Sequence, residues 1–230
     1  LSASENDDTI AWYENDGAAN PTFTKAVIAT SADNANDVQV ADLDGDGDLD
    51  IVSASSLDDT IAWYENDGAA NPTWAAADIA TNADGATSVF LVDLDSDGDI
   101  DILSSSYNDD TIAWYENNGA ANPTFTAADI ATTADHATSI DVVDIDFDGD
   151  LDIISSSEND DTITWYENNG AADPSWTTSS YGIATPDRST AADGAWGVHS
   201  GDIDGDGDID VVSASFNDDK IAWYQTDGSH

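Results

Sequence analysis

Four runs of aspartate at alternate positions are the residues of this chain best suited to chemistry. Each run reads D-x-D-x-D-G-D-x-D, and the runs span 42–50, 93–101, 144–152 and 202–210. Carboxylates this crowded repel one another unless a hard cation gathers them, and oxygen-only ligands around a glycine turn are typical of calcium sites. The runs therefore predict about four Ca²⁺ sites, one per run. The alternative is a set of solvated acidic turns without metal.

The composition of the chain is extremely acidic. There are 49 Asp and Glu residues against 3 Lys and Arg, for a formal net charge of -46. Self-repulsion of this size strains a compact state unless cations neutralise part of it. Because the surface would stay acidic even with four calcium ions bound, we expect no nucleic-acid partner and no binding to anionic membranes. No stretch approaches the ~20 apolar residues of a membrane span, so membrane insertion is not expected either.

The remaining composition indicates one folded repeat domain over 1–230. Hydrophobic residues make up 40% of the chain and there are eight tryptophans, which argues against disorder. The chain has no cysteine, so disulfides and thiolate metal sites are excluded and calcium would take the stabilising role. The start at Leu1 and the end at Gly228-Ser-His230 suggest a mature piece of a protein, with residues 228–230 left by cloning.

A repeat positions the four runs. The context I-[AT]-W-Y recurs at intervals of 51, 51, 51 and 58 residues, at Trp12, Trp63, Trp114, Trp165 and Trp223. Repeats of ~40 to 50 residues are typical of β-propeller blades. The repeats are expected at approximately 1–37, 38–88, 89–139, 140–197 and 198–228.

Each repeat is predicted to hold four short β-strands. In one copy the strands fall at 88–93, 102–105, 111–116 and 125–132, and the aspartate run forms the tight loop between the first two. No window has helical periodicity between capping signals. The predicted fold class is therefore all-β, a β-propeller of four-stranded antiparallel blades.

The strand count sets the expected size of the ring. The chain begins in the second strand of a repeat and ends after a third strand, which gives 18 strands. This favours five blades, two of them incomplete; the alternative is part of a larger, seven-bladed ring. The first repeat lacks its first strand and the last repeat lacks its fourth. In the usual closure the two termini complete one shared blade, and this ring would not close in that way. Self-association that completes the ring is one expected consequence.

The repeats resemble the FG-GAP or VCBS family, whose calcium-bearing blades also form the propeller of integrin alpha subunits. The resemblance rests on D-x-D-x-D-G-x-x-D, which all four runs match, and it covers essentially the whole chain. It implies side-chain ligands from the first, third, fifth and ninth positions of each run, a turn at the glycine, and a backbone carbonyl ligand from the seventh. An EF-hand is excluded, since the runs lack a Glu at position 12 and flanking helices.

The implied ligands are assigned run by run. The side-chain ligands would be Asp42, Asp44, Asp46 and Asp50; Asp93, Asp95, Asp97 and Asp101; Asp144, Asp146, Asp148 and Asp152; and Asp202, Asp204, Asp206 and Asp210. The carbonyl ligands would come from Asp48, Asp99, Asp150 and Asp208. The turns would lie at Gly47, Gly98, Gly149 and Gly207.

The loops of an antiparallel blade divide between two ends of the molecule. The aspartate runs and the [ND]-G-A-A-[ND]-P turns fall at one end, the aspartate end, and barely differ between copies. The loops between second and third strands, and those joining one repeat to the next, fall at the other end, the variable end. There the copies differ, which is where binding could be encoded.

Two repeat positions and one long loop supply the candidate ligand contacts. The turn before the third strand carries Glu5, Ser56, Tyr107, Glu158 and Phe216, and the first strand carries Gln39, Phe90, Asp141 and His199 at another equivalent position. The longest connection, around 185–196, adds an arginine and a tryptophan. The predicted ligand-binding residues are Trp196, His199, Arg188, Tyr107, Phe216, Phe90 and Asp141. Structural alternatives are packing for His199 and a loop anchor for Trp196.

Other repeated residues are interpreted as structural. The third-strand tryptophans, and Phe23, Trp74, Phe125 and Trp176 at a second shared position, are expected to pack between blades rather than to stack on sugars. The Asp-Asp pairs before the third strand, such as Asp58-Asp59, are expected to cap turns rather than to act as acid and base.

Three functions follow from these residues. The favoured one is a non-enzymatic, calcium-stabilised binding or adhesion module that recognises a glycan or a cell-surface protein through the variable end. The second is a polysaccharide lyase or hydrolase, which the scarcity of Lys, Arg and His disfavours. The third is a ligand-free spacer of a large adhesin. Weak calcium sites fill only at extracellular calcium levels, so an extracellular or cell-surface location is expected.

Overall fold

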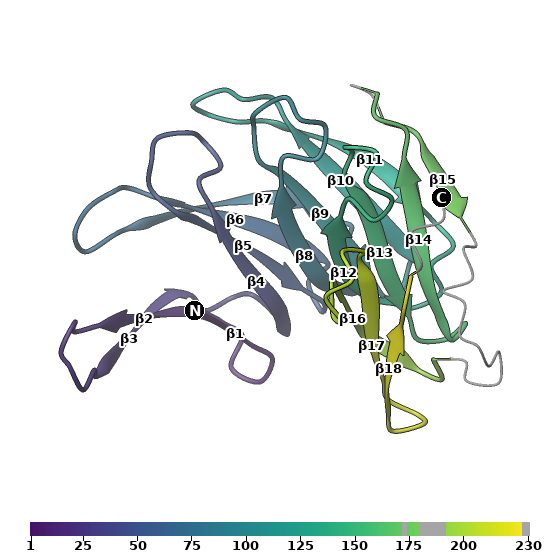
Figure 1. Cartoon of the computed structure of the whole chain (residues 1–230). Coiled ribbons are helices and arrows are strands. Elements are labelled where there is room, and N and C mark those ends of the chain that lie inside the picture. Colours follow the sequence, from purple (N-terminus) through teal and green to yellow (C-terminus); the bar gives the residue numbers. More distant parts are fainter. Residues whose placement is uncertain (172–173, 180–191, 227–230) are drawn as a thin grey trace.

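The computed structural model describes residues 1–171, 174–179 and 192–226 (Figure 1). These residues form 18 β-strands in five antiparallel sheets, and no helix, so the predicted all-β class is confirmed. No helix long and apolar enough to cross a membrane occurs in this part of the chain. The strands are β1 (Ser2–Ser4), β2 (Thr9–Asn15), β3 (Phe23–Ala29), β4 (Ala35–Ala41), β5 (Asp50–Ser55), β6 (Thr60–Asn66), β7 (Trp74–Ala80), β8 (Ala86–Val92), β9 (Asp101–Ser106), β10 (Thr111–Asn117), β11 (Phe125–Ala131), β12 (Ala137–Val143), β13 (Asp152–Ser157), β14 (Thr162–Asn168), β15 (Trp176–Ser179), β16 (Ala195–Gly201), β17 (Asp210–Ser215) and β18 (Lys220–Tyr224).

Each sheet is a simple antiparallel meander in chain order. The three central sheets have four strands, β4–β7, β8–β11 and β12–β15, whereas the first sheet (β1–β3) and the last (β16–β18) have three. The four predicted strands of the repeat match β8 to β11 to within two residues at each end. The boundaries were predictable because aspartate runs and Asn-Gly turns terminate the strands.

The sheets follow one another around an open arc (Figure 1). Each sheet contacts the next in chain order, chiefly through β4, β8, β12 and β16, the first strand of each later repeat. Within the described residues, the first and last sheets make no extensive contact with each other. The blade-like repeats are therefore present, but they do not form a closed propeller, and a seven-bladed ring remains a prediction.

The alternation of the third strand explains how one sheet packs on the next. In β6, Ile61 and Trp63 point to one face of the sheet and are 0% and 7% exposed. They join a cluster with Ala113 and Tyr115, which lie on the opposite-facing side of β10 in the following sheet. The last junction repeats this pattern, the third has Thr164 in place of the alanine, and the first buries Ile10 against Ala62 and Tyr64 without Trp12 in the cluster. Packing between sheets was the predicted role of these tryptophans, and it is confirmed for Trp63, Trp114 and Trp165.

A second set of contacts joins the sheets at the variable end. The backbone N–H of Gly85 donates to Asp59 Oδ1 (3.1 Å), and the N–H of Ala83 donates to the Asp59 carbonyl (3.0 Å). Asp59 precedes the third strand of one sheet, whereas Gly85 lies just before the first strand of the next. Asp8, Asp110 and Asp161 accept equivalent bonds. The turn-capping role predicted for the Asp-Asp pairs is thus confirmed, and the cap also links neighbouring sheets.

The arc supplies a matched pair of residues for measuring the packing energy. Ile112 and Ile221 occupy the same position of the repeat, but Ile112 is 0% exposed and Ile221 is 78% exposed because no sheet follows the last one. We expect Ile112→Ala to lower the free energy of unfolding by ~2–5 kcal/mol, and Ile221→Ala to change it by less than ~0.5 kcal/mol. Urea denaturation of the calcium-loaded protein would measure both. Equal losses would show that the sheets do not pack as described.

Candidate metal centres and binding face

Each aspartate run forms the loop between the first two strands of its sheet, which has four strands in the first three cases and three in the last. In the run from Asp93 to Asp101, between β8 and β9, Gly98 has φ +102°, a left-handed conformation that favours glycine. Gly47, Gly149 and Gly207 have φ of +96°, +102° and +101°. The predicted glycine turn is confirmed in all four runs.

The turns bring carboxylate oxygens together. In each run three side chains offer oxygens that all lie within 4.8 Å of one another. The first, third and fifth aspartates form the group in three runs, and the first, third and ninth form it in the run from Asp144. The groups are Asp42, Asp44 and Asp46; Asp93, Asp95 and Asp97; Asp144, Asp146 and Asp152; and Asp202, Asp204 and Asp206.

The first aspartate of three runs is oriented as a cation ligand would be. Asp42 Oδ2 accepts a hydrogen bond from the Gly47 N–H (3.0 Å), which fixes the carboxylate. Its Oδ1 is buried and has no hydrogen-bond partner, as are Asp93 Oδ1 and Asp144 Oδ1. A buried carboxylate oxygen without a donor is costly, and a divalent cation would satisfy it. The residues present therefore fit a calcium ion.

The third and fifth aspartates are held by the loop backbone. Asp44 Oδ1 accepts the Asp46 N–H (3.2 Å), and Asp46 Oδ1 accepts the Asp48 N–H (2.9 Å). The same bonds recur in the next two runs. The second carboxylate oxygen of Asp44, and that of Asp46, is left for a ligand role. The loop thus fixes three carboxylates before any cation arrives.

The ninth aspartate is buried and bonded on both oxygens. Asp101 Oδ2 accepts the Leu94 N–H (3.2 Å), and its Oδ1 accepts the Asn117 N–H (2.8 Å), which ties the loop to the end of β10. Burial raises the pKa of Asp101 to about 6 and that of Asp152 to about 7. Burial therefore disfavours the ionised forms, and a cation nearby would favour them. The predicted ligand role of this position stays a prediction.

The seventh aspartate turns its side chain away from the group. The Asp48 carboxylate lies directly against Gly68, in the turn after β6. Any residue with a Cβ would clash there, since the Cβ would lie 2.1 Å from Asp48 Oδ2. Asp99 and Asp150 lie against Gly119 and Gly170 in the same way. The loop after the first strand therefore packs on the turn after the third, as the two-ended arrangement predicts. The seventh side chain lies beside this turn and is not part of the carboxylate group, and the carbonyl-ligand role of this position stays a prediction.

An apolar residue inside each run anchors the loop in the packing between sheets. Leu43, between two aspartates of the first run, is 3% exposed and belongs to the cluster that joins the second and third sheets. Asn117 of the third sheet donates through Nδ2 to the Leu43 carbonyl (2.9 Å). Leu94 and Ile145 are buried in the next two junctions. A cation that orders the loop would therefore also order the junction between sheets.

At the variable end, Tyr107 is engaged within the protein. Its hydroxyl donates to the Glu158 carboxylate, and its ring stacks on His136, with centroids 4.0 Å apart. Acceptance by Glu158 is the main reason why the pKa of Tyr107 is raised to about 12. Tyr107 and Glu158 occupy the same position in adjacent repeats, so this position links neighbouring sheets. His136 was not among the predicted site residues, and its place in the loop before β12 gave no signal of this contact.

The candidates on the first strands lie along the inner side of the arc. Asp141 Oδ2 accepts both the N–H and the hydroxyl of Ser200 (2.6 Å each) and lies 3.2 Å from His199 Nδ1. The Asp141 side chain is only 7% exposed, whereas that of His199 is 79% exposed. Phe90 packs against the junction between the third and fourth sheets. Of these three residues, only His199 presents most of its side chain to solvent.

Trp196 and Phe216 form an exposed aromatic pair. Their ring centroids are 6.2 Å apart at 43°, and the residues are 54% and 70% exposed. Trp196 occupies the position at which the earlier sheets have Asn36, Thr87 and Thr138. The structure thus brings two of the predicted ligand-binding residues together. Arg188, the other prediction in this loop, lies outside the described residues.

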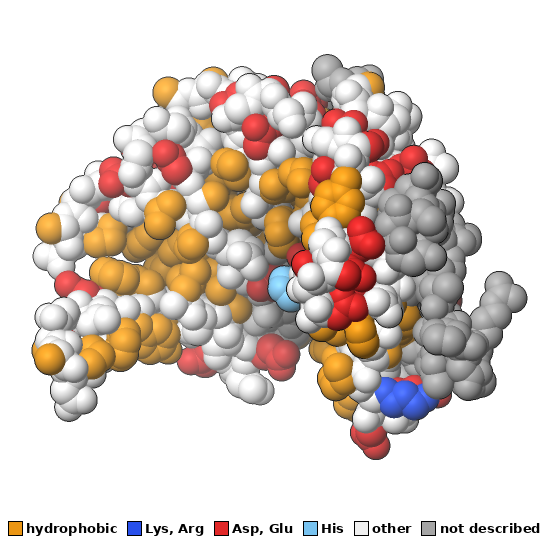
Figure 2. Space-filling model, viewed as in Figure 1, with side chains coloured by type: hydrophobic (Ala, Val, Ile, Leu, Met, Phe, Trp, Pro, Cys, Tyr) orange, Lys and Arg blue, Asp and Glu red, His pale blue; other side chains and the backbone are white. Residues whose placement is uncertain are grey.

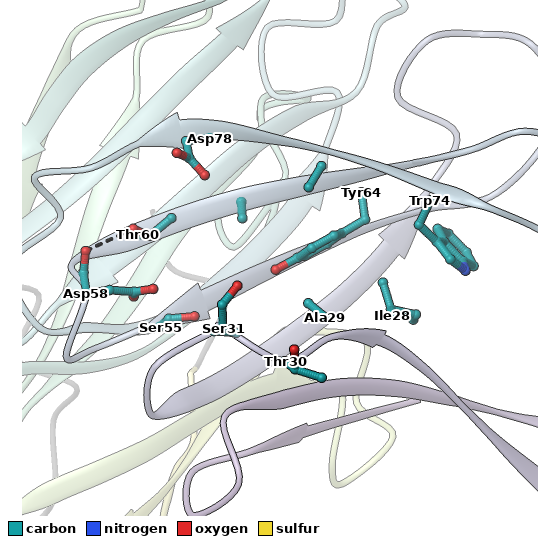
Figure 3. Close-up of a pocket in the computed structure, with 13 residues that line it drawn as sticks. Ile28, Ala29, Thr30, Ser31, Ser55, Asp58, Thr60, Tyr64, Trp74 and Asp78 are labelled. Atoms are coloured by element: carbon teal, nitrogen blue, oxygen red, sulfur yellow. Dashed lines mark hydrogen bonds between the residues drawn. The ribbon is translucent and has the colours of Figure 1, made fainter.

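Two pockets open at the variable end. One, of about 410 Å³, lies beside Trp196 and is lined by residues from the first four repeats, among them Glu5, Asn36, Thr87 and Tyr107. The other, of about 490 Å³, lies between β3 and the second sheet (Figure 3). Figure 3 shows Trp74 at one end of this second pocket, and Asp58 and Asp78 toward the other. Of the predicted ligand-binding residues, Tyr107 and Trp196 line the first pocket and none lines the second, so ligand binding stays a prediction.

Comparison with known proteins identifies the repeat. The model of the FG-GAP-like repeat matches residues 1–53, 42–104, 93–155 and 148–213. The chain belongs to the FG-GAP-like repeat family. The family resemblance predicted from the aspartate runs is thereby confirmed. No curated protein sequence matches the chain significantly.

One solved structure with a similar fold is the crystal structure of the V. cholerae biofilm matrix protein Bap1. The TM-score is 0.52 at 20% sequence identity, and the match covers 96% of this chain and 36% of that one. At this identity the likeness concerns the fold alone. This FG-GAP-like chain spans about a third of the length of the protein it matches.

The carboxylate groups predict the effect of calcium on stability. We expect chelation to lower the Tm markedly, because each run would keep three crowded carboxylates without a counter-charge, and calcium at ~0.1–1 mM to restore it. Thermal melts followed by circular dichroism would measure both. An unchanged Tm in chelator would refute the metal assignment.

The stoichiometry can be tested with a matched pair of substitutions. Asp93→Asn removes a charge at the orphaned oxygen of one run, whereas Asp129→Asn removes a charge from an exposed position on β11 of the same sheet. Equilibrium dialysis with metal analysis should give about four calcium ions for the wild type and for Asp129→Asn, and about three for Asp93→Asn. Equal losses in both variants would mean that calcium binds only as a diffuse counterion.

Proposed function

We propose that this chain is a calcium-stabilised, extracellular adhesion module that binds a glycan through its variable end. The observation that carries the proposal is the exposed Trp196–Phe216 pair beside a pocket. Large exposed aromatic rings in a soluble protein indicate a contact surface. The C–H faces of sugar rings are apolar and pack well on aromatic rings, while their hydroxyls need polar partners nearby.

The pocket beside Trp196 offers such polar partners. Its lining includes Glu5, Asn34, Asn36 and Asn108; the three asparagine amides already donate within the protein, so what these residues offer a ligand is chiefly acceptor oxygens. Part of this polarity is already used, since Thr87 Oγ1 and Thr138 Oγ1 donate to carbonyls of the next sheet at 2.9 Å. The remaining acceptors suit the hydroxyl groups of a neutral sugar. The surrounding carboxylates disfavour an acidic one.

The aspartate end supports the calcium and location parts of the proposal. Three runs hold a buried carboxylate oxygen without a donor, and the groups lie at the surface, where dissolved calcium can reach them. Open loop sites with several waters belong to the weak class that fills at extracellular calcium levels. Salt outside cells also screens the acidic surface.

Membership of the FG-GAP-like family and the fold shared with a biofilm matrix protein support adhesion as the broader class. Fold alone does not establish function, so the argument for a ligand rests on the aromatic pair. In this proposal the module is not an enzyme, and its calcium ions hold the blades rather than react.

Binding can be tested on a glycan array in the presence and absence of calcium. We expect binding of a neutral glycan that Trp196→Ala weakens by about tenfold or more, and Phe216→Ala to a similar extent, since such aromatic contacts contribute more than ~1 kcal/mol. Phe147→Ala is the matched control, because Phe147 is likewise 54% exposed but lies at the aspartate end. It should bind as the wild type does.

The alternatives predict different results in the same experiment. A ligand-free spacer would bind no glycan and no cell-surface protein at any calcium concentration. An enzyme would convert acidic polysaccharides and lose turnover in His199→Ala. Either result would overturn the proposal.

A further inference from the structure

The two ends of the arc expose residues that are buried everywhere else in the repeat. At the internal junctions the Ile of one third strand, joined by Trp in three of the four, packs on the Tyr side of the third strand in the next sheet. Among the described residues no sheet packs on the Ile/Trp face of the last sheet or on the Ala/Tyr face of the first; on that second face Ala11 is still 0% exposed, whereas Tyr13 is 41% exposed. Figure 2 shows apolar side chains in the hollow between the two ends of the arc.

The uncovered face of the last sheet consists of Ile203, Ile221 and Trp223, which we call the leading face. These residues are 49%, 78% and 48% exposed. Their equivalents in the third sheet, Leu94, Ile112 and Trp114, are 2%, 0% and 4% exposed. Because the residue types hardly differ, the exposure results only from the lack of a neighbouring sheet.

The uncovered face of the first sheet consists of Tyr13, Phe23 and Val27, which we call the trailing face. They are 41%, 60% and 50% exposed, whereas the tyrosine equivalent to Tyr13 in the third sheet, Tyr115, is 5% exposed. Phe125, the equivalent of Phe23, packs edge-on against Trp63 of the preceding sheet, with ring centroids 6.3 Å apart at 70°. Phe23 has no such tryptophan before it.

We propose that the leading face of one copy of this chain binds the trailing face of a second copy. The internal junctions are the template: Trp223 would meet Phe23 as Trp63 meets Phe125, and Ile221 would meet the Tyr13 side of the sheet as Ile61 meets Tyr115. The contact continues, between chains, an interface that the chain already forms four times within itself. Apolar burial drives it, and the repeated geometry gives it a register.

The interface is heterologous, because the two faces differ. Within one described chain these faces lie on sheets that make no extensive contact, so each remains available to another copy. A heterologous contact repeats head to tail and forms a closed ring or an open filament. A second copy therefore adds blades to the arc in the order in which the chain already stacks them.

The acidic charge of the chain determines the salt and calcium concentrations at which two copies can associate. Two copies with a formal charge of -46 each repel one another, so the contact requires calcium and screening by salt. Ile203 lies inside the fourth aspartate run, whose three grouped carboxylates are all exposed. A cation bound there would order the loop that presents part of the leading face.

Two blocked variants test the proposal. The leading-face block is Ile221→Ser with Trp223→Ser, and the trailing-face block is Tyr13→Ser with Phe23→Ser. All four positions are already exposed, so both variants should fold, which far-ultraviolet circular dichroism would check. Leu57→Ser is the matched control, because Leu57 is 70% exposed but lies on neither face.

Sedimentation velocity in calcium and physiological salt supplies the readout. We expect the wild type and Leu57→Ser to form species with a mass greater than that of the 24.1 kDa monomer. The fraction of protein in these species should increase with protein concentration. Each blocked variant alone should stay monomeric. An equimolar mixture of the two should give a 1:1 heterodimer, because each variant keeps the face that the other lacks.

Three results would overturn the proposal: a wild type that stays monomeric at its highest attainable concentration, a mixture that stays monomeric, or blocked variants that associate as the wild type does. A monomeric wild type would mean that these faces close on each other or are covered by something other than a second copy. Glycan binding by the leading-face block is independent of this result, so failure here would leave the proposed function untouched.

Discussion

The packing of one sheet face on the next is the interaction on which the rest of this structure depends. A three-to-four-stranded sheet of this size cannot bury its apolar side chains alone, so each repeat relies on its neighbours for a core. The third strand meets this need on both faces at once, with Ile and Trp on one side and Ala and Tyr on the other. The Ile and Trp side chains of one sheet pack among the Ala and Tyr side chains of the next, so large and small residues together fill the space between sheets.

The aspartate loops depend on this packing and reinforce it. Leu43 packs in the junction between sheets, while the side chains of its neighbours, Asp42 and Asp44, belong to the carboxylate group. One loop therefore contributes both to the core and to the candidate metal site. The Asn117 side chain, from the following sheet, bonds the carbonyl of the same Leu43. A cation that relieved the electrostatic repulsion in the loop would therefore also support apolar burial between sheets. Such coupling would help a chain with so many carboxylates and no disulfide to hold a compact form.

At the variable end, the same backbone frame carries side chains with different duties. Asp59 and its equivalents fix the loops between sheets, which leaves neighbouring positions free to differ. Some differences serve structure: Tyr107 bonds Glu158, and Asp141 bonds Ser200. Others, such as Trp196 and Phe216, point into solvent beside a pocket. Sequence variation between repeats predicted that binding residues lie at this end. It did not distinguish the variable residues that bond within the protein from those that are exposed to solvent.

The sequence by itself determined the local features of this protein. Strand boundaries, the glycine turns and the two ends of each sheet follow from alternation and turn residues within some fifty positions, because these depend on neighbours along the chain. The tertiary structure alone decided which copies of a repeated residue are buried. Ile112 and Ile221 are the same residue at the same repeat position, yet one is fully buried and the other is mostly exposed. Burial depends on the presence of a neighbouring sheet, and that is a property of the arc rather than of the repeat.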